Sequence, residues 1–185
     1  MGKDQQISFE TERLQLRPWR ESDAEALYRW ASDPQVGPIA GWAPHASVEE
    51  SRRIIRTLFS APETYAVVPK GSDEPIGCVG ILFDSGMHTA ALQADEAEIG
   101  FWIAVPYWGR GLIPEAVERL LRHCFDTLRL AAVWCGYYEG NERSRRVGEK
   151  CGFSYHHTEH DKLSPLGDRR TEHFTRLTRD AWQKR

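Results

Sequence analysis

The sequence is poor in cysteine and has no long apolar stretch. Its cysteines lack the paired spacing of a disulfide framework or a zinc site. We therefore expect reduced thiols in a cytoplasmic protein that binds no metal. No apolar run approaches the roughly 20 residues that cross a membrane, and no signal peptide is expected at the start. The four cysteines are Cys78, Cys124, Cys135 and Cys151.

A large excess of charge is also absent. The net charge is −3 and the isoelectric point is near 6.2, which argues against a dedicated nucleic-acid-binding protein. The hydrophobic content of 41% and charged content of 28% are typical of a globular protein. The 185 residues suit one domain, residues 1–185, and neither a repeat nor a low-complexity linker divides them.

The alternation of strand-like and helix-like patterns predicts an α/β (α+β) fold. We expect a mixed, mostly antiparallel seven-stranded sheet with helices on both faces, in the order β-α-α-β-β-β-α-β-α-β-β. The strands are predicted at residues 12–18, 65–68, 76–83, 97–105, 131–138, 153–158 and 171–178, and the helices at 22–32, 47–59, 114–127 and 141–151. Ser22 and Ser47 begin capping-box patterns for the first two helices. A helical crossover makes the fourth and fifth strands parallel neighbours.

Residues 97–116 form the stretch with the clearest chemical implication, a strand followed by a glycine turn and a helix start. The first turn of a helix has unpaired N–H groups and the positive end of the helix dipole, so it attracts anions. Gly109 and Gly111 permit positive φ and close approach, and Arg110 adds a fixed charge. Pro114 is tolerated in a first helical turn. The pattern is neither a Rossmann fingerprint nor a P-loop. It predicts phosphate binding, and a simple strand–helix connection is the alternative.

Three stretches together resemble the GCN5-related N-acetyltransferase (GNAT) superfamily, in its ribosomal-protein N-terminal acetyltransferase (RimJ/RimL-like) branch. The stretches are residues 9–17, residues 98–103 followed by 108–111, and residues 141–153. The resemblance covers nearly the whole chain, and each stretch alone is a weak signal.

The resemblance implies acetyl-coenzyme A (acetyl-CoA) as donor. It implies that the backbone of Ile103, Ala104 and Val105 pairs with the pantetheine arm, and that Asn141 hydrogen-bonds it. It implies that the coenzyme site also includes the turn and helix start, namely Trp108, Gly109, Arg110, Gly111, Leu112 and Ile113. Ile113 stands where the superfamily usually has Gly or Ala, and Pro114 where this branch often has Thr.

Acetyl transfer to an amine needs a base, an acid and a place for the acceptor. Glu98, upstream of the pantetheine segment, is the preferred base, with Glu96 as the weaker candidate. Ser144 matches the family position that faces the thiol and is the candidate acid. Tyr137 and Tyr138 are the alternatives for that role, because many superfamily members use a tyrosine.

The residues near the acceptor are predicted from their loop positions. Trp42 and His45 lie in a loop that in this family can border the acceptor site, and Trp108 also lies in a loop. His156, His157 and His160 look like a metal cluster, but adjacent strand residues point to opposite faces, so no metal site is expected.

The predicted activity is acetyl transfer to a primary amine by direct transfer in a ternary complex. The acceptor could be a protein N-terminal amine, a small amine, a polyamine or an antibiotic. A non-catalytic acyl-CoA-binding module and a nucleotide-binding α/β protein are the competing hypotheses. We expect a monomer or homodimer with no membrane or nucleic-acid partner.

Overall fold

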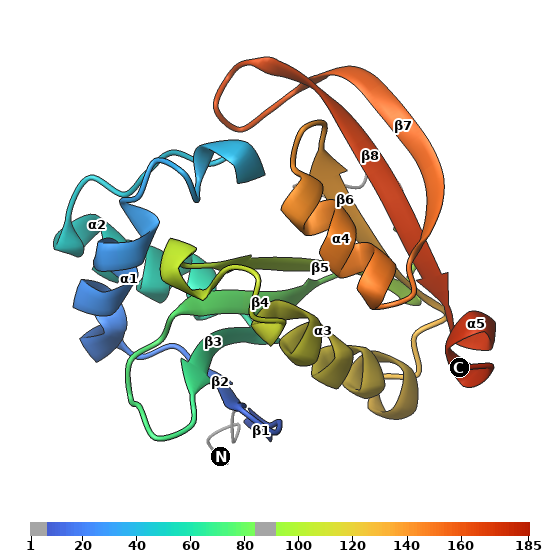
Figure 1. The fold of residues 1–185 in the computed structure, drawn as a ribbon, viewed down its shortest axis with the longest axis horizontal. Helices are drawn as coiled ribbons and strands as arrows, with labels where there is room; N and C mark the ends of the chain where they lie inside the picture. Colours follow the sequence, from blue (N-terminus) through green and yellow to red (C-terminus); the bar gives the residue numbers. More distant parts are fainter. Residues whose placement is uncertain (1–6, 84–91) are drawn as a thin grey trace.

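The computed structural model describes residues 7–83 and 92–185, and within them one sheet of eight strands organises the fold. The strand order is β1-β2-β3-β4-β5-β6-β8-β7 (Figure 1). Every neighbouring pair is antiparallel except β5 and β6, which are parallel as predicted. The strands are β1 (Phe9–Glu10), β2 (Leu14–Pro18), β3 (Thr64–Pro69), β4 (Gly77–Leu82), β5 (Glu96–Ile103), β6 (Ala132–Tyr138), β7 (Ser154–Leu163) and β8 (Arg169–Thr178).

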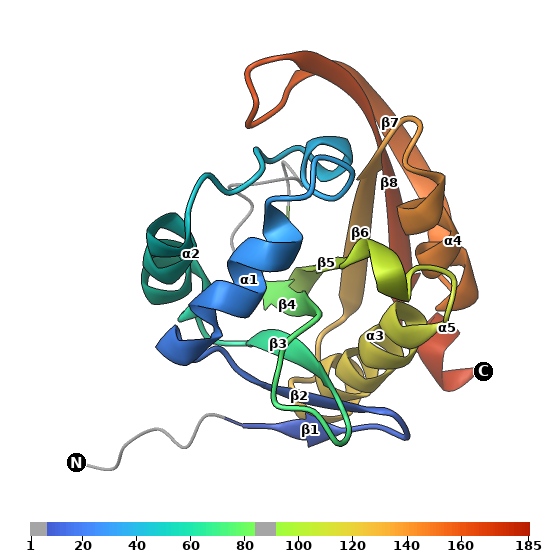
Figure 2. The ribbon, with the colours of Figure 1, turned by 60° about the vertical axis from the view of Figure 1, so that its left-hand side comes forward.

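Helices cover both faces of the sheet. On one face lie α1 (Ala24–Ala31) and α2 (Val48–Ile54), and on the other α3 (Leu112–Arg122) and α4 (Glu142–Lys150), with the sheet between the two pairs (Figure 2). Two helices continue as π-helical turns, α2 through Ile55–Phe59 and α3 through His123–Thr127. The short helix α5 (Arg179–Gln183) follows β8. None of the helices in the described ranges is long and apolar enough to cross a membrane.

Two apolar clusters hold these layers together, because successive strand residues point to opposite faces. Val67 of β3 belongs to the larger cluster under α3, whereas its neighbours Ala66 and Val68 belong to the smaller cluster under α1. Leu120 of α3 and Leu27 of α1 are fully buried in their respective clusters. One strand therefore contributes to both layers.

The parallel pair β5–β6 is short, and this positions the site. Glu96, Ala97 and Glu98 pair with Ala132, Val133 and Trp134. Beyond these residues β5 continues along β4 to Ile103, while β6 continues along β8 to Tyr138. The two halves of the sheet therefore separate after Glu98, and the facing edges of β5 and β6 no longer pair with each other.

The structure corrects three details of the prediction. Residues 9–10 add an eighth strand, because a strand of two residues is too short to produce an alternating pattern. The last two strands are longer than predicted, with ten residues each, and form a hairpin. Ser22 lies inside a 3-10 turn and does not cap α1. The N-cap position of α1 is Asp23, whose side chain accepts the Arg20 N–H. The Ser47 cap is confirmed, with its hydroxyl accepting the Glu50 N–H at 3.1 Å.

Candidate active site

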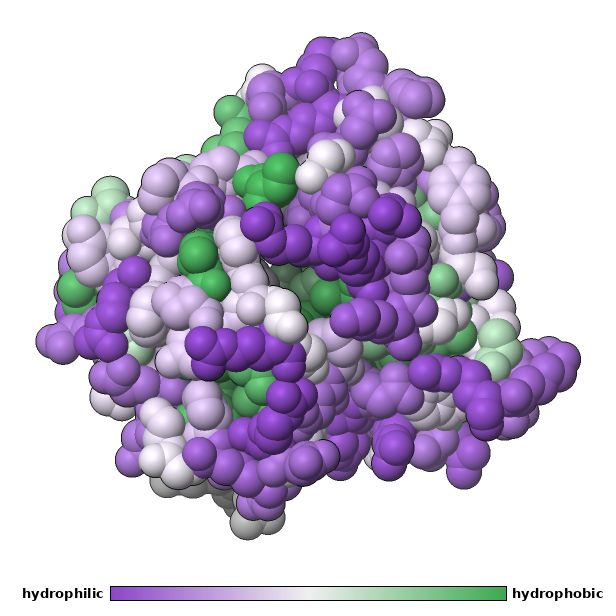
Figure 3. Space-filling model, in the orientation of Figure 1, coloured by the Kyte–Doolittle hydropathy of each residue, from purple (hydrophilic) through white to green (hydrophobic). Residues whose placement is uncertain are grey.

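The candidate site is a cavity of about 870 Å³ that reaches both faces of the sheet. Alternate residues of β5 line it from opposite sides. Those on the α1–α2 side are Glu98, Gly100 and Trp102. Those on the α3–α4 side are Ile99, Phe101 and Ile103. The cavity thus passes through the sheet where β5 and β6 separate. Seen in the orientation of Figure 1, the molecular surface has a hollow near its middle (Figure 3). Hydrophobic residues lie inside this hollow, and hydrophilic residues over α4 form its rim.

The glycine turn before α3 adopts the conformation that anion binding needs. Gly109 and Gly111 both have φ of 74°, a left-handed conformation that favours glycine. A Cβ at Gly109 would meet no atom of residues 7–83 and 92–185 within 4 Å, so this part of the chain leaves open space above the turn. The first turn of α3 adds the N–H groups of Leu112 and Ile113, which have no partner four residues earlier. These groups fit a pyrophosphate.

Arg13, far away in sequence, holds this turn in place. Its guanidinium Nη1 donates to the Arg110 carbonyl at 2.9 Å, and its Nε donates to Glu115 of α3 at 2.6 Å. Thr11 also donates to Glu115, at 2.6 Å. Burial opposes ionisation of Glu115, but these hydrogen bonds outweigh it and lower the pKa of that carboxyl. The connection between β1 and β2 therefore fixes the start of α3.

The backbone of residues 103–105 differs from what the resemblance implies. The Ala104 N–H donates to the Ile76 carbonyl at 2.8 Å and its carbonyl accepts from Tyr107, so both groups are engaged. Ala104, Val105 and Arg110 also lie outside the cavity wall. Because backbone directions alternate in an antiparallel pair, groups aimed at the gap come from Ile99, Phe101 and Ile103. Sequence reasoning named Ile103 alone of these three.

Helix α4 brings positive charge to the same side. Arg143, Arg146 and Lys150 line the cavity, as do Asn141 and Ser144. The Asn141 Oδ1 accepts the Ser144 N–H at 3.2 Å and caps the helix.

Trp108 connects α4 to the glycine turn. Its indole N–H donates to the Ile103 carbonyl at 2.8 Å, and the Arg143 guanidinium lies 3.7 Å from its ring centroid. The three cations were not predicted as site residues from the sequence, because the resemblance implies roles only at the start of this helix.

The α1–α2 side has the opposite charge. Glu98 is 4% exposed and Glu172 of β8 is 1% exposed, and both line the cavity. A Cβ placed on Gly136 would lie 3.3 Å from Oε1 of Glu98 and 3.0 Å from Oε1 of Glu172. Gly136 therefore leaves the space in which the two carboxylates approach each other. Glu172 also forms an ion pair with Lys162 at 2.8 Å. No local motif marks Glu172, because it reaches the site only through the β6–β8 pairing.

The three remaining candidates for proton transfer, Glu96, Tyr137 and Tyr138, differ in position, and Tyr137 lines the cavity. Glu96 accepts from the Trp134 indole at 2.8 Å and from Arg176, and it does not line the cavity. Tyr138 does line it and is buried. Burial, reinforced by the nearby Glu172 carboxylate, raises the pKa of Tyr138 to about 12. Of the two predicted base candidates, Glu98 faces the cavity and Glu96 does not.

Trp42 and His45 meet on the same side of the sheet as Glu98. Their ring centroids are 5.7 Å apart, and Trp42 lies edge-on to Trp102 at 5.9 Å. The His45 Nδ1 is 2.8 Å from the Ser51 hydroxyl. Burial lowers the pKa of His45, with a smaller opposing effect from Glu50, so the neutral ring is favoured. The structure thus brings both predicted acceptor residues to the cavity wall.

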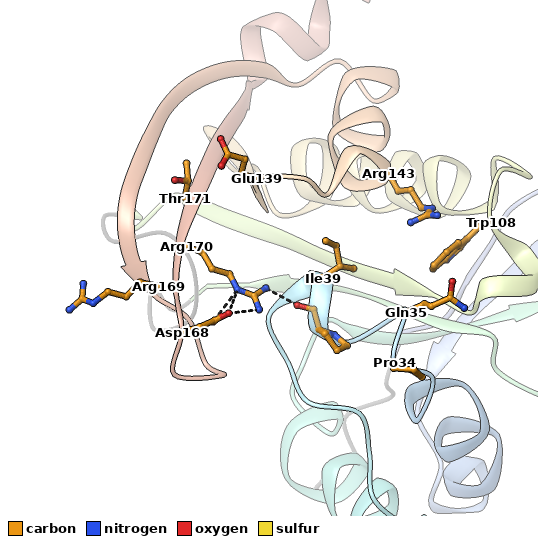
Figure 4. A pocket seen from close by; sticks show the side chains of 11 residues that line it. Pro34, Gln35, Ile39, Trp108, Glu139, Arg143, Asp168, Arg169, Arg170 and Thr171 are labelled. Carbon is orange, nitrogen blue, oxygen red and sulfur yellow. Dashed lines mark hydrogen bonds and ion pairs between the residues drawn. The ribbon is translucent and has the colours of Figure 1, made fainter.

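A second cavity, of about 770 Å³, adjoins the first and shares Ile39, Trp108 and Arg143 with it. Arg170 crosses one end of this outer cavity (Figure 4). It is paired with Asp168 at 2.8 Å and donates to the Pro38 carbonyl at 2.7 Å, which ties the β7–β8 turn to the loop after α1.

The predicted orientation of the histidines on β7 is wrong. The register between β7 and β8 shifts between Tyr155 and His157. This bulge brings His156 and His157 to the same side, with their Nδ1 atoms 2.9 Å apart. Across the described part of the chain, no group of three or more His, Cys, Asp or Glu side chains is arranged to hold a metal ion.

Comparison with known proteins identifies the family. The family model described as "Acetyltransferase (GNAT) domain" matches residues 13–154, so the chain belongs to the GNAT acetyltransferase family. The chain is 31% identical over 126 residues to the uncharacterized N-acetyltransferase p20 of Bacillus licheniformis, covering 65% of this chain and 67% of that protein. It is 36% identical over 80 residues to YdaF of Bacillus subtilis, for which the name proposes a ribosomal N-acetyltransferase, covering 40% of this chain and 44% of that protein.

The fold agrees with this assignment. The crystal structure of a GNAT-family acetyltransferase from Bacillus anthracis has a TM-score of 0.81 to this chain at 19% identity, covering 94% of this chain and 99% of that one. The protein is therefore an N-acetyltransferase of the GNAT family.

Proposed function

We propose that the protein transfers the acetyl group of acetyl-CoA to a primary amine, directly, in a ternary complex. The observation that carries this proposal is the distribution of charge along the through-sheet cavity. Its charged wall residues on the α3–α4 side are the three cations Arg143, Arg146 and Lys150. Those on the α1–α2 side are the three carboxylates Glu50, Glu98 and Glu172. An anionic coenzyme and a cationic amine would each meet the opposite charge and approach from opposite faces.

The coenzyme would bind along the α3–α4 side. The amides of Gly109, Gly111, Leu112 and Ile113 would hold the pyrophosphate. Pro114 has no N–H and removes one donor, but the remaining amides and the helix dipole supply the main attraction. The pantetheine arm would lie in the gap along β5, where the backbone groups of Phe101 and the N–H of Ile103 are directed away from β4, since the Ile103 carbonyl already accepts from the Trp108 indole. Asn141 would donate to it from the other edge.

The reaction requires the neutral amine as nucleophile. The amine nitrogen attacks the thioester carbonyl carbon, the new C–N bond forms and the C–S bond breaks. Glu98 would take the proton that the amine nitrogen loses, and Ser144 would give a proton to the leaving sulfur and be reprotonated from solvent. The position of Glu98 at the point where β5 and β6 separate supports this role, because the two sides of the cavity meet there.

A protein N-terminal amine is one candidate acceptor. The likeness to YdaF favours it. An α-amine has a pKa of about 8, so a useful fraction is neutral near pH 7, whereas a lysine amine at about 10.4 requires more help from the base.

Incubation with acetyl-CoA and a panel of amines and peptides tests the proposal. We expect free thiol to appear only when an amine is present, together with a product that is heavier by one acetyl group. Binding of acetyl-CoA without thiol release from any amine would favour the non-catalytic module. Thermal stabilisation by ATP or NAD but not by acetyl-CoA would contradict the coenzyme assignment.

A further inference from the structure

The α1–α2 side of the main cavity is an apolar chamber, which we call the acceptor chamber. Its apolar and aromatic wall is drawn from α1, α2, the loop between them and the strand faces beneath. These residues are Leu27, Ala31, Val36, Ile39, Trp42, Ile54, Leu58, Phe59, Ala61, Cys78, Leu82 and Trp102. Within the described residues, the charged side chains that line it are Glu50, Glu98 and Glu172.

Part of this apolar surface is exposed to solvent and is not covered by other side chains. Leu58 is 48% exposed and Ile39 is 37% exposed, although both line the cavity. Two glycines, Gly80 and Gly100, stand on the strand face that forms the chamber floor. Among the described residues, a Cβ on Gly100 would meet just one atom, Cδ1 of Leu82, at 3.8 Å, so the described floor has room for more atoms than it holds. A concave apolar wall with a few polar groups at one end is the usual form of a small-molecule pocket.

The polar end of the acceptor chamber is the carboxylate pair. Oε1 of Glu98 and Oε1 of Glu172 both lie within 3.3 Å of the position that a Cβ of residue 136 would occupy. Lys162 pairs with Glu172 at 2.8 Å, and two neighbouring carboxylates with one lysine still attract a further positively charged group. The ammonium form of a primary amine meets this requirement on arrival; it loses one proton to solvent to become the nucleophile, and Glu98 would take the second proton as the C–N bond forms.

We infer that the acceptor is a primary amine that carries a bulky apolar group close to its nitrogen. The ammonium would bind beside Glu98 and Glu172, and the apolar group would fill the acceptor chamber between Trp42, Trp102 and Leu58. This inference rests on the proposed function and narrows it. A polyamine fits less well, because Glu50 already accepts from the Ala46 N–H at 2.6 Å and pairs with Arg53 at 3.6 Å, so a second ammonium would be placed against the apolar wall. A hydrophilic first residue such as serine would leave the wall exposed.

Two sources can supply this chemistry, a small alkyl or arylalkyl amine and a peptide whose first residue is large and apolar. The experiment uses both, with kcat/KM measured for methylamine, butylamine, hexylamine and phenethylamine, and for peptides beginning with Gly, Ser, Leu or Phe. We expect kcat/KM to rise by up to about fourfold for each methylene that the chamber buries. Preference for the monoamines would identify a small-molecule acceptor, and preference for Leu and Phe peptides would identify a protein N-terminus.

Two variants connect the preference to the chamber. Gly100→Val adds atoms to the floor at a position whose φ suits any residue, and it should reduce the ratio of kcat/KM for hexylamine to that for methylamine by about tenfold or more. Leu58→Ala removes apolar wall and should reduce the same ratio by about fivefold. Leu166→Ala is the matched control, since Leu166 is 38% exposed and lines neither cavity, and its ratio should equal that of the wild type. Thermal unfolding followed by circular dichroism verifies that each variant is folded.

The results distinguish a failure of the inference about the acceptor from a failure of the proposed acetyl-transfer function. A wild-type enzyme that acetylates methylamine or Gly peptides as well as hexylamine or Phe peptides would overturn the inference and leave the proposed function intact. Higher kcat/KM for spermidine than for hexylamine would also overturn it. If no amine in the panel releases thiol from bound acetyl-CoA, the proposed function itself fails.

Discussion

The two sides of the through-sheet cavity differ in charge and in how they are built. The α3–α4 side is basic and is formed by a glycine turn, a helix start and one face of α4. The α1–α2 side is acidic and apolar and is assembled from α1, α2, the loop between them, and strands β3, β4, β5, β6 and β8. The first consists of short segments that each carry a motif, whereas the second depends on contacts between distant segments. The residues proposed to bind the co-substrate therefore form motifs that can be recognised in the sequence, whereas the residues of the proposed acceptor pocket do not.

The largest expected effect is on the acidic side. Glu98→Gln keeps the shape of the side chain and removes its basicity, so turnover should fall by about 10²- to 10⁴-fold. Affinity for acetyl-CoA, measured by calorimetry, should remain within about twofold, because Glu98 lies outside the basic side. Glu10→Gln, an exposed carboxylate on β1, is the control. A parallel loss of coenzyme affinity would contradict the division of labour between the two sides.

Gly111→Asp makes the complementary change on the basic side. Its Cβ would lie 3.7 Å from Nη2 of Arg13, so the new carboxylate would neutralise that cation beside the proposed pyrophosphate position, and acetyl-CoA binding should weaken by at least about 100-fold. Gly71→Asp has nearly the same backbone strain, with φ of 83° and no atom within 4 Å of its Cβ, but lies in the turn before β4. Calorimetric titration should give wild-type affinity for the Gly71 variant. Equal weakening in both variants would show that strain, not the anion site, is responsible.

Ser144→Ala addresses the group that we propose as the proton donor to the thiolate. We expect turnover to fall by about tenfold, less than for Glu98→Gln, because a thiol with a pKa near 8.5 leaves readily. Coenzyme affinity should not change, since the cap of α4 depends on the Asn141 side chain and the Ser144 backbone. Unchanged turnover would show that Ser144 does not protonate the leaving sulfur and would leave Tyr138 or water as the proton donor. Tyr138→Phe would then be the variant to measure.

The smallest effect is a pH dependence of stability on the acidic side. Burial lowers the pKa of His45 in the folded protein, so the unfolded chain binds a proton more readily as the pH falls below about 6.5. The free energy of unfolding should therefore decrease between pH 7 and pH 5 more steeply in the wild type than in His45→Gln. His160→Gln, at an exposed position on β7, provides the comparison in urea titrations. Identical slopes in all three proteins would contradict the assignment.

Much of the fold follows from patterns that are local in sequence. The periodicity of residues 97–105 and 131–138 predicted β5 and β6, and the crossover rule made them parallel. The cap at Ser47 and the positive φ of Gly109 and Gly111 follow from the chemistry of single residues. The bulge at His156 could not be predicted, because the register of an edge hairpin depends on its partner strand.

The candidate site likewise contains residues that local patterns predict and residues that only the fold brings to it. Glu98 was identified from its place on β5, and the structure puts it at the cavity where Glu96 is not. Arg13 stabilises the glycine turn from a segment 97 residues away from Arg110, a contact that no local pattern encodes. Glu172 joins Glu98 because β8 inserts beside β6, before β7 in space and after it in sequence.

The sequence by itself determined the family, the glycine turn and the element order, because these depend on backbone preferences and on side chains close along the chain. Only the tertiary structure decided that the cavity crosses the sheet, that its two sides carry opposite charge and that an apolar chamber ends at two carboxylates. The physical reason is that β5 and β6 stop pairing after Glu98, and this separation brings together side chains from strands and helices that are distant in sequence.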